Sequence, residues 1–168
     1  MEIEKKWIVD KTKFDEVIKH NIGSRKIEQH YMNSAVEEWI IRIRSTKDGK
    51  YLTLKSKGLL SREELEVEID DSQFKMMKEH ALTSLKKTRY LVPHPFNYKM
   101  YICEVDVYDD YDFITCEIEF ATEEEANKFK MPDWCLRDVT YDESFKNNNL
   151  AKMDFAKKFK ESRLFKDK

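Results

Sequence analysis

The chain has 168 residues, of which 40% are hydrophobic and 38% are charged, and its formal net charge at pH 7 is −2. This length suits one domain with a sizeable core, and because the two signs of charge nearly cancel, the overall charge indicates neither a nucleic-acid-binding nor a membrane-binding protein. Three glycines and three prolines argue against disorder, low-complexity sequence and a glycine-rich phosphate loop.

Alternation of apolar and charged residues with period two predicts about eight strands. In chain order, the expected strands cover residues 1–9, 26–32, 39–45, 51–57, 62–69, 85–92, 98–108 and 113–120, with a short last segment at 138–140. Pro93 and Pro95 should end the strand that begins at residue 85. Helical periodicity and capping residues predict helices over 10–20 and 71–82, a short helix after Thr122, and a final helix over about 150–164.

The charged side chains of most strands share one face and one sign. The cationic pairs are Arg42 and Arg44, Lys55 and Lys57, and Lys87 and Arg89, and the anionic pairs are Glu104 and Asp106, and Glu117 and Glu119. The first strand places Glu2, Glu4 and Lys6 on one face. Strands on a solvated surface normally mix the two signs, so this segregation indicates a specific use for the charges.

Two architectures fit the alternation: an open antiparallel sheet with one solvated face, and a closed barrel with its apolar face outward under helices and its ionic face toward a lumen. Periodicity alone does not separate them. The segregated charges suggest a cationic wall that faces an anionic wall. The first wall suits a polyanion, and the second suits divalent metal ions.

The cysteines Cys103, Cys116 and Cys135 are odd in number and lack CxxC spacing. They indicate reduced thiols in a cytosolic protein rather than a disulfide framework or a zinc site. The charged N-terminus does not resemble a signal peptide, and no apolar run approaches the length of a membrane span. We therefore expect one cytoplasmic domain over residues 1–168.

Several segments resemble, in order, those of one known superfamily. Glu2 to Lys6 fits the ExExK signature of the CYTH superfamily, the triphosphate tunnel metalloenzymes. Further similar segments are Ile27 to Tyr31, Ile41 to Arg44, Tyr51 to Lys55, Arg62 to Ile69, Lys87 to Tyr90, Glu104 to Val107, Glu117 to Glu119 and Val139 to Leu150. The resemblance spans residues 1 to about 151, and Pro93 to Met100 is its least similar part.

The resemblance implies an α+β fold in which an eight-stranded antiparallel closed β-barrel forms a tunnel flanked by helices, often in a homodimer. Members of the superfamily bind a triphosphate group in the tunnel and need Mg2+ or Mn2+. A triphosphate carries roughly four negative charges, so several fixed cations must bind it. The side chains expected to do so are Lys6, Arg42, Arg44, Lys55, Arg62, Lys87 and Arg89.

Carboxylates would supply the hard oxygen ligands that Mg2+ and Mn2+ prefer. The expected metal ligands are Glu2, Glu4, Glu117 and Glu119, with Asp106 completing a second site. We interpret Glu104 and some of Glu64, Glu66 and Glu68 as partners that hold arginine and lysine side chains in place.

Three residues are expected to take part in catalysis: Lys87, Tyr31 and Lys6. The resemblance implies that Lys87 and Tyr31 position the attacking water, although Tyr31 could equally belong to the core. The four histidines are not spaced as metal ligands and are interpreted as incidental.

The function expected is metal-dependent hydrolysis of a small polyanionic triphosphate, foremost inorganic tripolyphosphate, at a terminal phosphoanhydride bond. A class IV-type adenylyl cyclase or a thiamine or nucleoside triphosphatase is the first alternative, and a cyclase would need an adenine pocket that no segment identifies. A non-catalytic polyphosphate- or nucleotide-binding protein is the second. Such a protein would be expected to lose a metal-binding carboxylate, yet Glu2, Glu4, Glu117 and Glu119 are all present.

Overall fold

The computed structural model of the chain describes residues 1–32 and 38–152. Within them, the strands are β1 (Glu2–Val9), β2 (Ser24–Tyr31), β3 (Trp39–Thr46), β4 (Gly49–Ser56), β5 (Ser61–Arg62), β6 (Glu64–Glu68), β7 (Thr83–Phe96), β8 (Lys99–Tyr108), β9 (Ile114–Glu119) and β10 (Cys135–Asp138). The helices are α1 (Phe14–Ile18), α2 (Asp71–Glu79), α3 (Glu123–Lys128) and α4 (Asn147–Lys152), with a 3₁₀ turn at Glu143–Phe145. The expected final helix over 150–164 lies largely outside the described residues.

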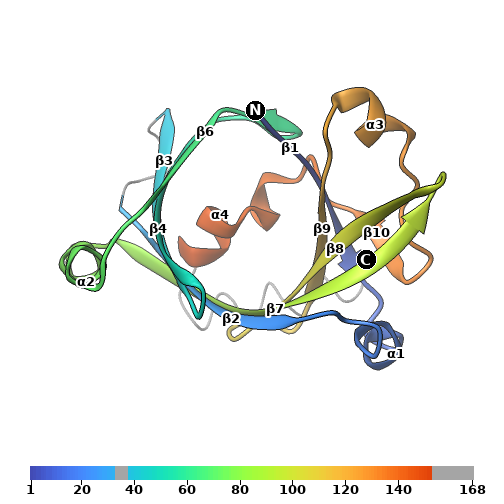
Figure 1. Ribbon diagram of the computed structural model, residues 1–168, viewed down its shortest axis with the longest axis horizontal. Coiled ribbons are helices and arrows are strands. Elements are labelled where there is room, and N and C mark those ends of the chain that lie inside the picture. Colours follow the sequence, from blue (N-terminus) through green and yellow to red (C-terminus); the bar gives the residue numbers. More distant parts are fainter. Residues whose placement is uncertain (33–37, 153–168) are drawn as a thin grey trace.

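All the described strands belong to one antiparallel sheet that curves into a nearly closed barrel (Figure 1). The hydrogen-bonded order is β10-β1-β9-β8-β7-β2-β3-β4-β6, and β5 pairs separately with β1. Strand β1 uses one edge for β9 and shares the other between β5, at Glu2 and Ile3, and β10, from Trp7 to Val9. The barrel prediction is therefore confirmed.

The count of eight strands was too low, because nine described strands follow the continuous path and β5 is a tenth. The single strand expected over residues 62–69 is divided at Glu63, whose backbone N–H and C=O both bond to Ser56 at the end of β4. Residues before this point pair with β1, and residues after it pair with β4. The segment 61–68 thus joins the two ends of the ring.

Strand β7 continues through both prolines to Phe96, so the expected end at Val92 was wrong. The Leu91 N–H donates to the Gly23 carbonyl oxygen, on the side of β2. The backbone nitrogens of Pro93 and Pro95, which carry no hydrogen, point to this same side. Because β2 begins at Ser24, no described strand lies opposite them at this edge of β7. Proline is tolerated at such an edge because no ladder hydrogen bond is lost.

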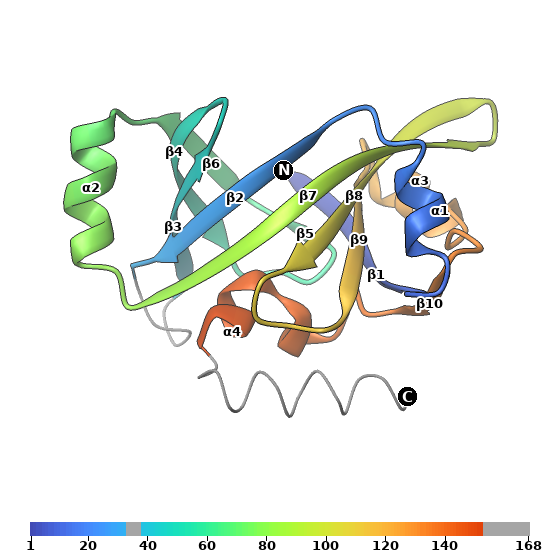
Figure 2. The same ribbon diagram turned by 90° about the horizontal axis from the view of Figure 1, so that it is seen from below.

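The helices lie outside the sheet except at one end of the barrel. Helix α1 is shorter than the expected 10–20: Asp10 accepts hydrogen bonds from the Thr12 N–H and hydroxyl, and no described side chain caps the helix. Helix α2 carries the capping box formed by Asp70 and Gln73. Figure 2 shows α4 at one end of the barrel, and in Figure 1 the same helix lies across the ring. No helix in the described part of the chain has the length and apolar character that crossing a bilayer requires.

Two apolar clusters stabilise the barrel, one on its outer side and one at the end of its interior that lies near α4. The larger one includes Trp7, Val105 and Phe129 and packs beneath α3, and all three cysteines are buried there as free thiols. The smaller one surrounds Phe113 and Phe145, near α4. The larger cluster buries the outward faces and the smaller one fills the end of the interior near α4, so the charged side chains line the remaining interior.

Gly58, in the connection between β4 and β5, has no room for a side chain. A Cβ at this position would lie 2.1 Å from the Ser61 carbonyl oxygen, whereas nothing lies within 4 Å of a Cβ at Gly23. We expect Gly58→Ala to lower the free energy of unfolding by about 1–3 kcal/mol, because backbone must move to relieve the clash. Urea denaturation would measure this, with Gly23→Ala as the matched control, and equal effects of the two changes would contradict it.

Candidate functional site

The barrel encloses a cavity of about 270 Å³ whose lining residues are mostly charged. Eight cations and seven carboxylates line it among the described residues. The cations are Lys6, Arg42, Arg44, Lys55, Arg62, Lys87, Arg89 and Lys146, and the carboxylates are Glu2, Glu4, Glu64, Glu66, Glu104, Glu117 and Glu119. All seven expected substrate-binding residues and four of the five expected metal ligands therefore meet in one cavity, because period-two alternation points them to the same side of the sheet.

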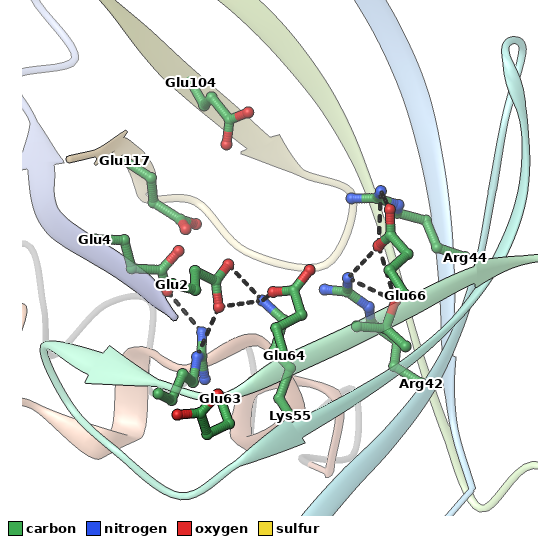
Figure 3. Close-up of polar contacts among 12 residues, drawn as sticks. Glu2, Glu4, Arg42, Arg44, Lys55, Glu63, Glu64, Glu66, Glu104 and Glu117 are labelled. Atoms are coloured by element: carbon green, nitrogen blue, oxygen red, sulfur yellow. Dashed lines mark hydrogen bonds and ion pairs between the residues drawn. The ribbon is translucent and has the colours of Figure 1, made fainter. Parts of the chain in front are cut away.

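The charges separate into two arcs that follow the strand order. Neighbouring strands β1, β9 and β8 carry most of the carboxylates, whereas β7, β3 and β4 carry cations, with Gln29 and Tyr31 of β2 between them. Strand β6 interrupts this arrangement, since Glu64 and Glu66 lie beside the cations and pair with them. Glu66 accepts hydrogen bonds from Thr53 and Arg44, and Figure 3 shows it next to both cavity arginines of β3.

Like charges lie directly opposite each other on the acidic side of the cavity. Glu4 is the cross-strand partner of Glu119, and Glu104 is the partner of Glu117. Such pairs repel and destabilise a sheet unless a cation compensates. Burial and the nearby Glu117 raise the pKa of Glu4 to about 7, and burial together with Glu2 raises the pKa of Glu119.

This carboxylate group suits a divalent cation by its chemistry. Glu117 Oε1 is buried and accepts no well-aligned hydrogen bond from the described residues, although Lys6 Nζ lies 3.2 Å from it. Oxygen-rich carboxylate sites are those that Mg2+ and Mn2+ occupy. In their present positions, however, no three acidic, histidine or cysteine side chains of the described residues converge on one point. Glu2 and Glu4 are instead turned toward Arg62 and Lys55.

Asp106 does not line the cavity, which departs from its expected role as a metal ligand. Its side chain is fully buried and accepts hydrogen bonds from Lys87 Nζ at 2.5 Å and from Arg89 Nε at 2.7 Å and Nη2 at 2.8 Å. Although burial opposes its charge, Arg89 and Lys87 lower the pKa of Asp106. The carboxylate therefore holds two cavity cations from behind.

Lys87, Tyr31 and Lys6 all reach the cavity. Burial and the neighbouring Arg89 lower the pKa of Lys87 to about 8. The Tyr31 hydroxyl accepts a hydrogen bond from Gln29 at 2.8 Å, and burial raises its pKa. Lys6 donates to the Phe145 carbonyl oxygen at 2.9 Å and lies 3.2 Å from Glu117.

One side of the cavity was not expected from the sequence: it is formed at the start of α4 by Lys146, Asn147 and Asn148. These residues follow the last strand, so strand periodicity could not place them. Only the resemblance over Val139 to Leu150 pointed to this segment. Burial and the nearby Arg62 lower the pKa of Lys146, whose ammonium donates to the Gly58 carbonyl oxygen. None of the four histidines lines the cavity.

The chain is similar to one known family of proteins and to two inorganic triphosphatases. The model of the family described as CYTH domain matches residues 1–138. An inorganic triphosphatase of Nitrosomonas europaea is 33% identical over 153 residues, which are 89% of this chain and 96% of that protein. An inorganic triphosphatase of Acetivibrio thermocellus is 32% identical over 165 residues, 95% of this chain and 98% of that protein. The crystal structure of an inorganic triphosphatase superposes with a TM-score of 0.61 at 27% identity and covers 92% of this chain and 96% of its own.

The buried carboxylate of Asp106 gives a direct test of the cavity's electrostatics. We expect Asp106→Asn to lower the free energy of unfolding by about 3–5 kcal/mol, because the change leaves Lys87 and Arg89 buried without their counterion. Glu104→Gln, which removes a 40% exposed partner of the same arginine, should cost only about 0–1 kcal/mol. Urea denaturation of both variants would measure the difference, and a small effect at Asp106 would contradict its anchoring role.

Proposed function

Since the chain belongs to the CYTH domain family, we propose that it is a divalent-metal-dependent hydrolase of short triphosphates, with inorganic tripolyphosphate as its substrate. The two similar curated proteins are inorganic triphosphatases, and this chain spans nearly their whole length. The observation that carries the proposal is the cavity itself, in which a cationic arc faces paired carboxylates. A hydrolase of this kind needs both, one for the phosphates and one for the metal.

The balance of charge in the cavity supports a metal requirement. The lining has only one more cation than carboxylates among the described residues, whereas tripolyphosphate brings roughly four negative charges. The polyanion therefore needs further positive charge, and the carboxylates of β1 and β9 are the groups that would hold it. Mg2+ or Mn2+ bound there by Glu2, Glu4, Glu117 and Glu119 would neutralise these side chains and stabilise charge on the phosphates.

The chain's own cations would hold the triphosphate across the cavity. Arg42 and Arg44 offer planar guanidinium groups for bidentate contacts to phosphate oxygens. Arg89 and Lys87 approach from β7 and are fixed by Asp106. Held in this way, the substrate would present its terminal phosphorus to water, with little freedom to be lost during the reaction.

Lys87 and Tyr31 are proposed to position the attacking water. A lysine with a pKa near 8 is partly neutral at mildly alkaline pH, and its Nζ can then accept a proton as the water attacks. The water oxygen forms a bond to the terminal phosphorus while the phosphoanhydride bond breaks. Tripolyphosphate would thus yield orthophosphate and pyrophosphate.

Two alternatives remain distinguishable by experiment. An adenylyl cyclase or an organic triphosphatase would need a surface for its organic group, yet Ile40 and Tyr31 supply nearly all the apolar character of the described lining. A non-catalytic binding protein would retain affinity without turnover.

We further propose that the enzyme is a cytosolic homodimer that binds neither nucleic acid nor membrane, which sedimentation velocity and fractionation would test.

We expect the wild-type protein, with Mg2+ or Mn2+, to release orthophosphate from tripolyphosphate faster than from ATP or thiamine triphosphate. Glu4→Gln should lose this activity at least a hundredfold, because it removes a carboxylate proposed to bind the metal. Glu124→Gln, on the exposed side of α3, is the matched control and should retain activity. Pyrophosphate with cyclic AMP from ATP would instead identify a cyclase, and tight binding without turnover would identify a binding protein.

The proposed role of Lys87 predicts that the rate rises with pH. Below about pH 8 the ammonium form dominates in the free enzyme and above it the amine dominates, so kcat/KM should increase through this region and then level off. The corresponding rise in kcat should occur at a higher pH, because phosphates bound near Lys87 favour its ammonium form. Lys87→Arg should lack this limb while keeping any limb due to ionisation of the substrate, and an unchanged profile in the variant would refute the assignment.

A further inference from the structure

Arg62 occupies both carboxylates at the N-terminal end of β1. Its Nε donates to Glu2 Oε2 at 2.9 Å, and its Nη2 donates to Glu4 Oε1 at 2.7 Å. The position is fixed by the sheet, since Arg62 is the cross-strand partner of Glu2 in the short pairing between β5 and β1. One guanidinium thus contacts two of the proposed metal ligands.

Lys55 adds a second cation at the same carboxylates. Its Nζ lies 2.7 Å and 2.9 Å from the two oxygens of Glu2 and 3.1 Å from Glu64. Figure 3 shows these three side chains together at the edge of the cavity, beside Glu4. Both oxygens of Glu2 are therefore engaged, and a metal ion would have to compete with Lys55 and Arg62 for them.

The other cavity cations are held differently. Lys87 and Arg89 are anchored by Asp106, outside the cavity wall, and Arg44 pairs with Glu66. Lys6 approaches Glu117, but it is also tied to the Phe145 carbonyl oxygen. By contrast, every hydrogen bond and ion pair found for Arg62 within the described residues goes to Glu2 or Glu4.

We propose that Arg62 and Lys55 are exchange cations: a divalent metal ion that takes Glu2 and Glu4 displaces them, and the displaced side chains then bind the triphosphate. This inference rests on the proposed function and adds an order of binding: the metal ion takes the carboxylates, and the released cations then bind the phosphates. The same two side chains cannot pair fully with the carboxylates and with phosphate, so one interaction must be given up for the other. Arg62 and Lys55 therefore act as positioning residues whose partner depends on the metal.

The exchange makes binding of the metal and of the triphosphate cooperative. Each metal ion bound at Glu2 and Glu4 frees cations for the phosphates, and each triphosphate that captures Arg62 frees carboxylates for the metal. Because coupling between two ligands is reciprocal, each should tighten the other by the same factor. A simple electrostatic attraction between metal and phosphate would also couple them, so the test must isolate Arg62.

The first measurement is the affinity for Mn2+ alone, by electron paramagnetic resonance of the free ion. We expect Arg62→Met to bind Mn2+ on the order of tenfold more tightly than the wild type, because the competing guanidinium is gone. Arg44→Met is the matched control: it removes the same charge from the same cavity, but not from the metal ligands, and should tighten binding by less than about threefold. Equal affinities in the two variants would overturn the proposal.

The second measurement uses bis(methylene)triphosphate, an analogue that resists hydrolysis. In the wild type, saturating Mn2+ should tighten its binding by at least about tenfold, and in Arg62→Met this factor should fall severalfold. In Arg44→Met the analogue should bind more weakly while the Mn2+ factor is kept. Full retention of the Mn2+ factor in Arg62→Met would overturn the exchange.

Folding of the variants is followed by circular dichroism and thermal melting. If Arg62→Met does not fold, Arg62→Lys decides, because a lysine keeps the charge but does not bridge two carboxylates in the same way. It should bind Mn2+ more tightly than the wild type, and an unchanged affinity would overturn the proposal. If the wild type hydrolyses tripolyphosphate with Mn2+ but substitution of Arg62 leaves the Mn2+ affinity unchanged, the exchange alone is refuted. If the wild type neither binds Mn2+ nor hydrolyses tripolyphosphate, the proposed function is refuted.

Discussion

Neutralisation of charge inside the barrel is the constraint on which the structure depends. Fifteen charged side chains line a cavity of about 270 Å³, and charges removed from water are costly unless they are paired and hydrogen-bonded. The fold meets this requirement by pairing the cations of β3, β4 and β7 with carboxylates of other strands. Asp106 is the clearest example, because one buried carboxylate accepts hydrogen bonds from both Lys87 and Arg89.

The segment that links the two ends of the barrel also supplies residues of the site. Residues 61–62 pair with β1 and residues 64–68 pair with β4, and this switch of partners at Glu63 links the two ends of the nearly closed barrel. It also places Arg62 against Glu2 and Glu4, and Glu66 against Arg44. The acidic strand β6 therefore does not belong to the metal side of the cavity. It stabilises the cations that the triphosphate is proposed to use.

Much of the architecture could be read from the sequence, since alternation with period two fixes which residues share a face. Arg42 and Arg44, or Glu117 and Glu119, had to point to one side once a strand was assigned. The prolines of β7 misled the prediction because propensity describes the residue alone, whereas the edge that Pro93 faces depends on where β2 begins. The split of one expected strand into β5 and β6 likewise depends on a change of neighbour at Glu63, which no local pattern records.

The sequence by itself determined most of the strands, which charges share a face and, through its motifs, the family to which the chain belongs. Only the tertiary structure decided how deeply each charge lies and which partner it meets. Asp106 and Glu104 share a face of β8, yet Asp106 is fully buried behind the wall while Glu104 lines the cavity. Lys55 meets Glu2 across 53 positions of the chain, and Lys6 meets Phe145 across 139. Such pairs depend on how the ring curves and closes, because periodicity assigns a side chain to a face but does not set its depth or its distant neighbours.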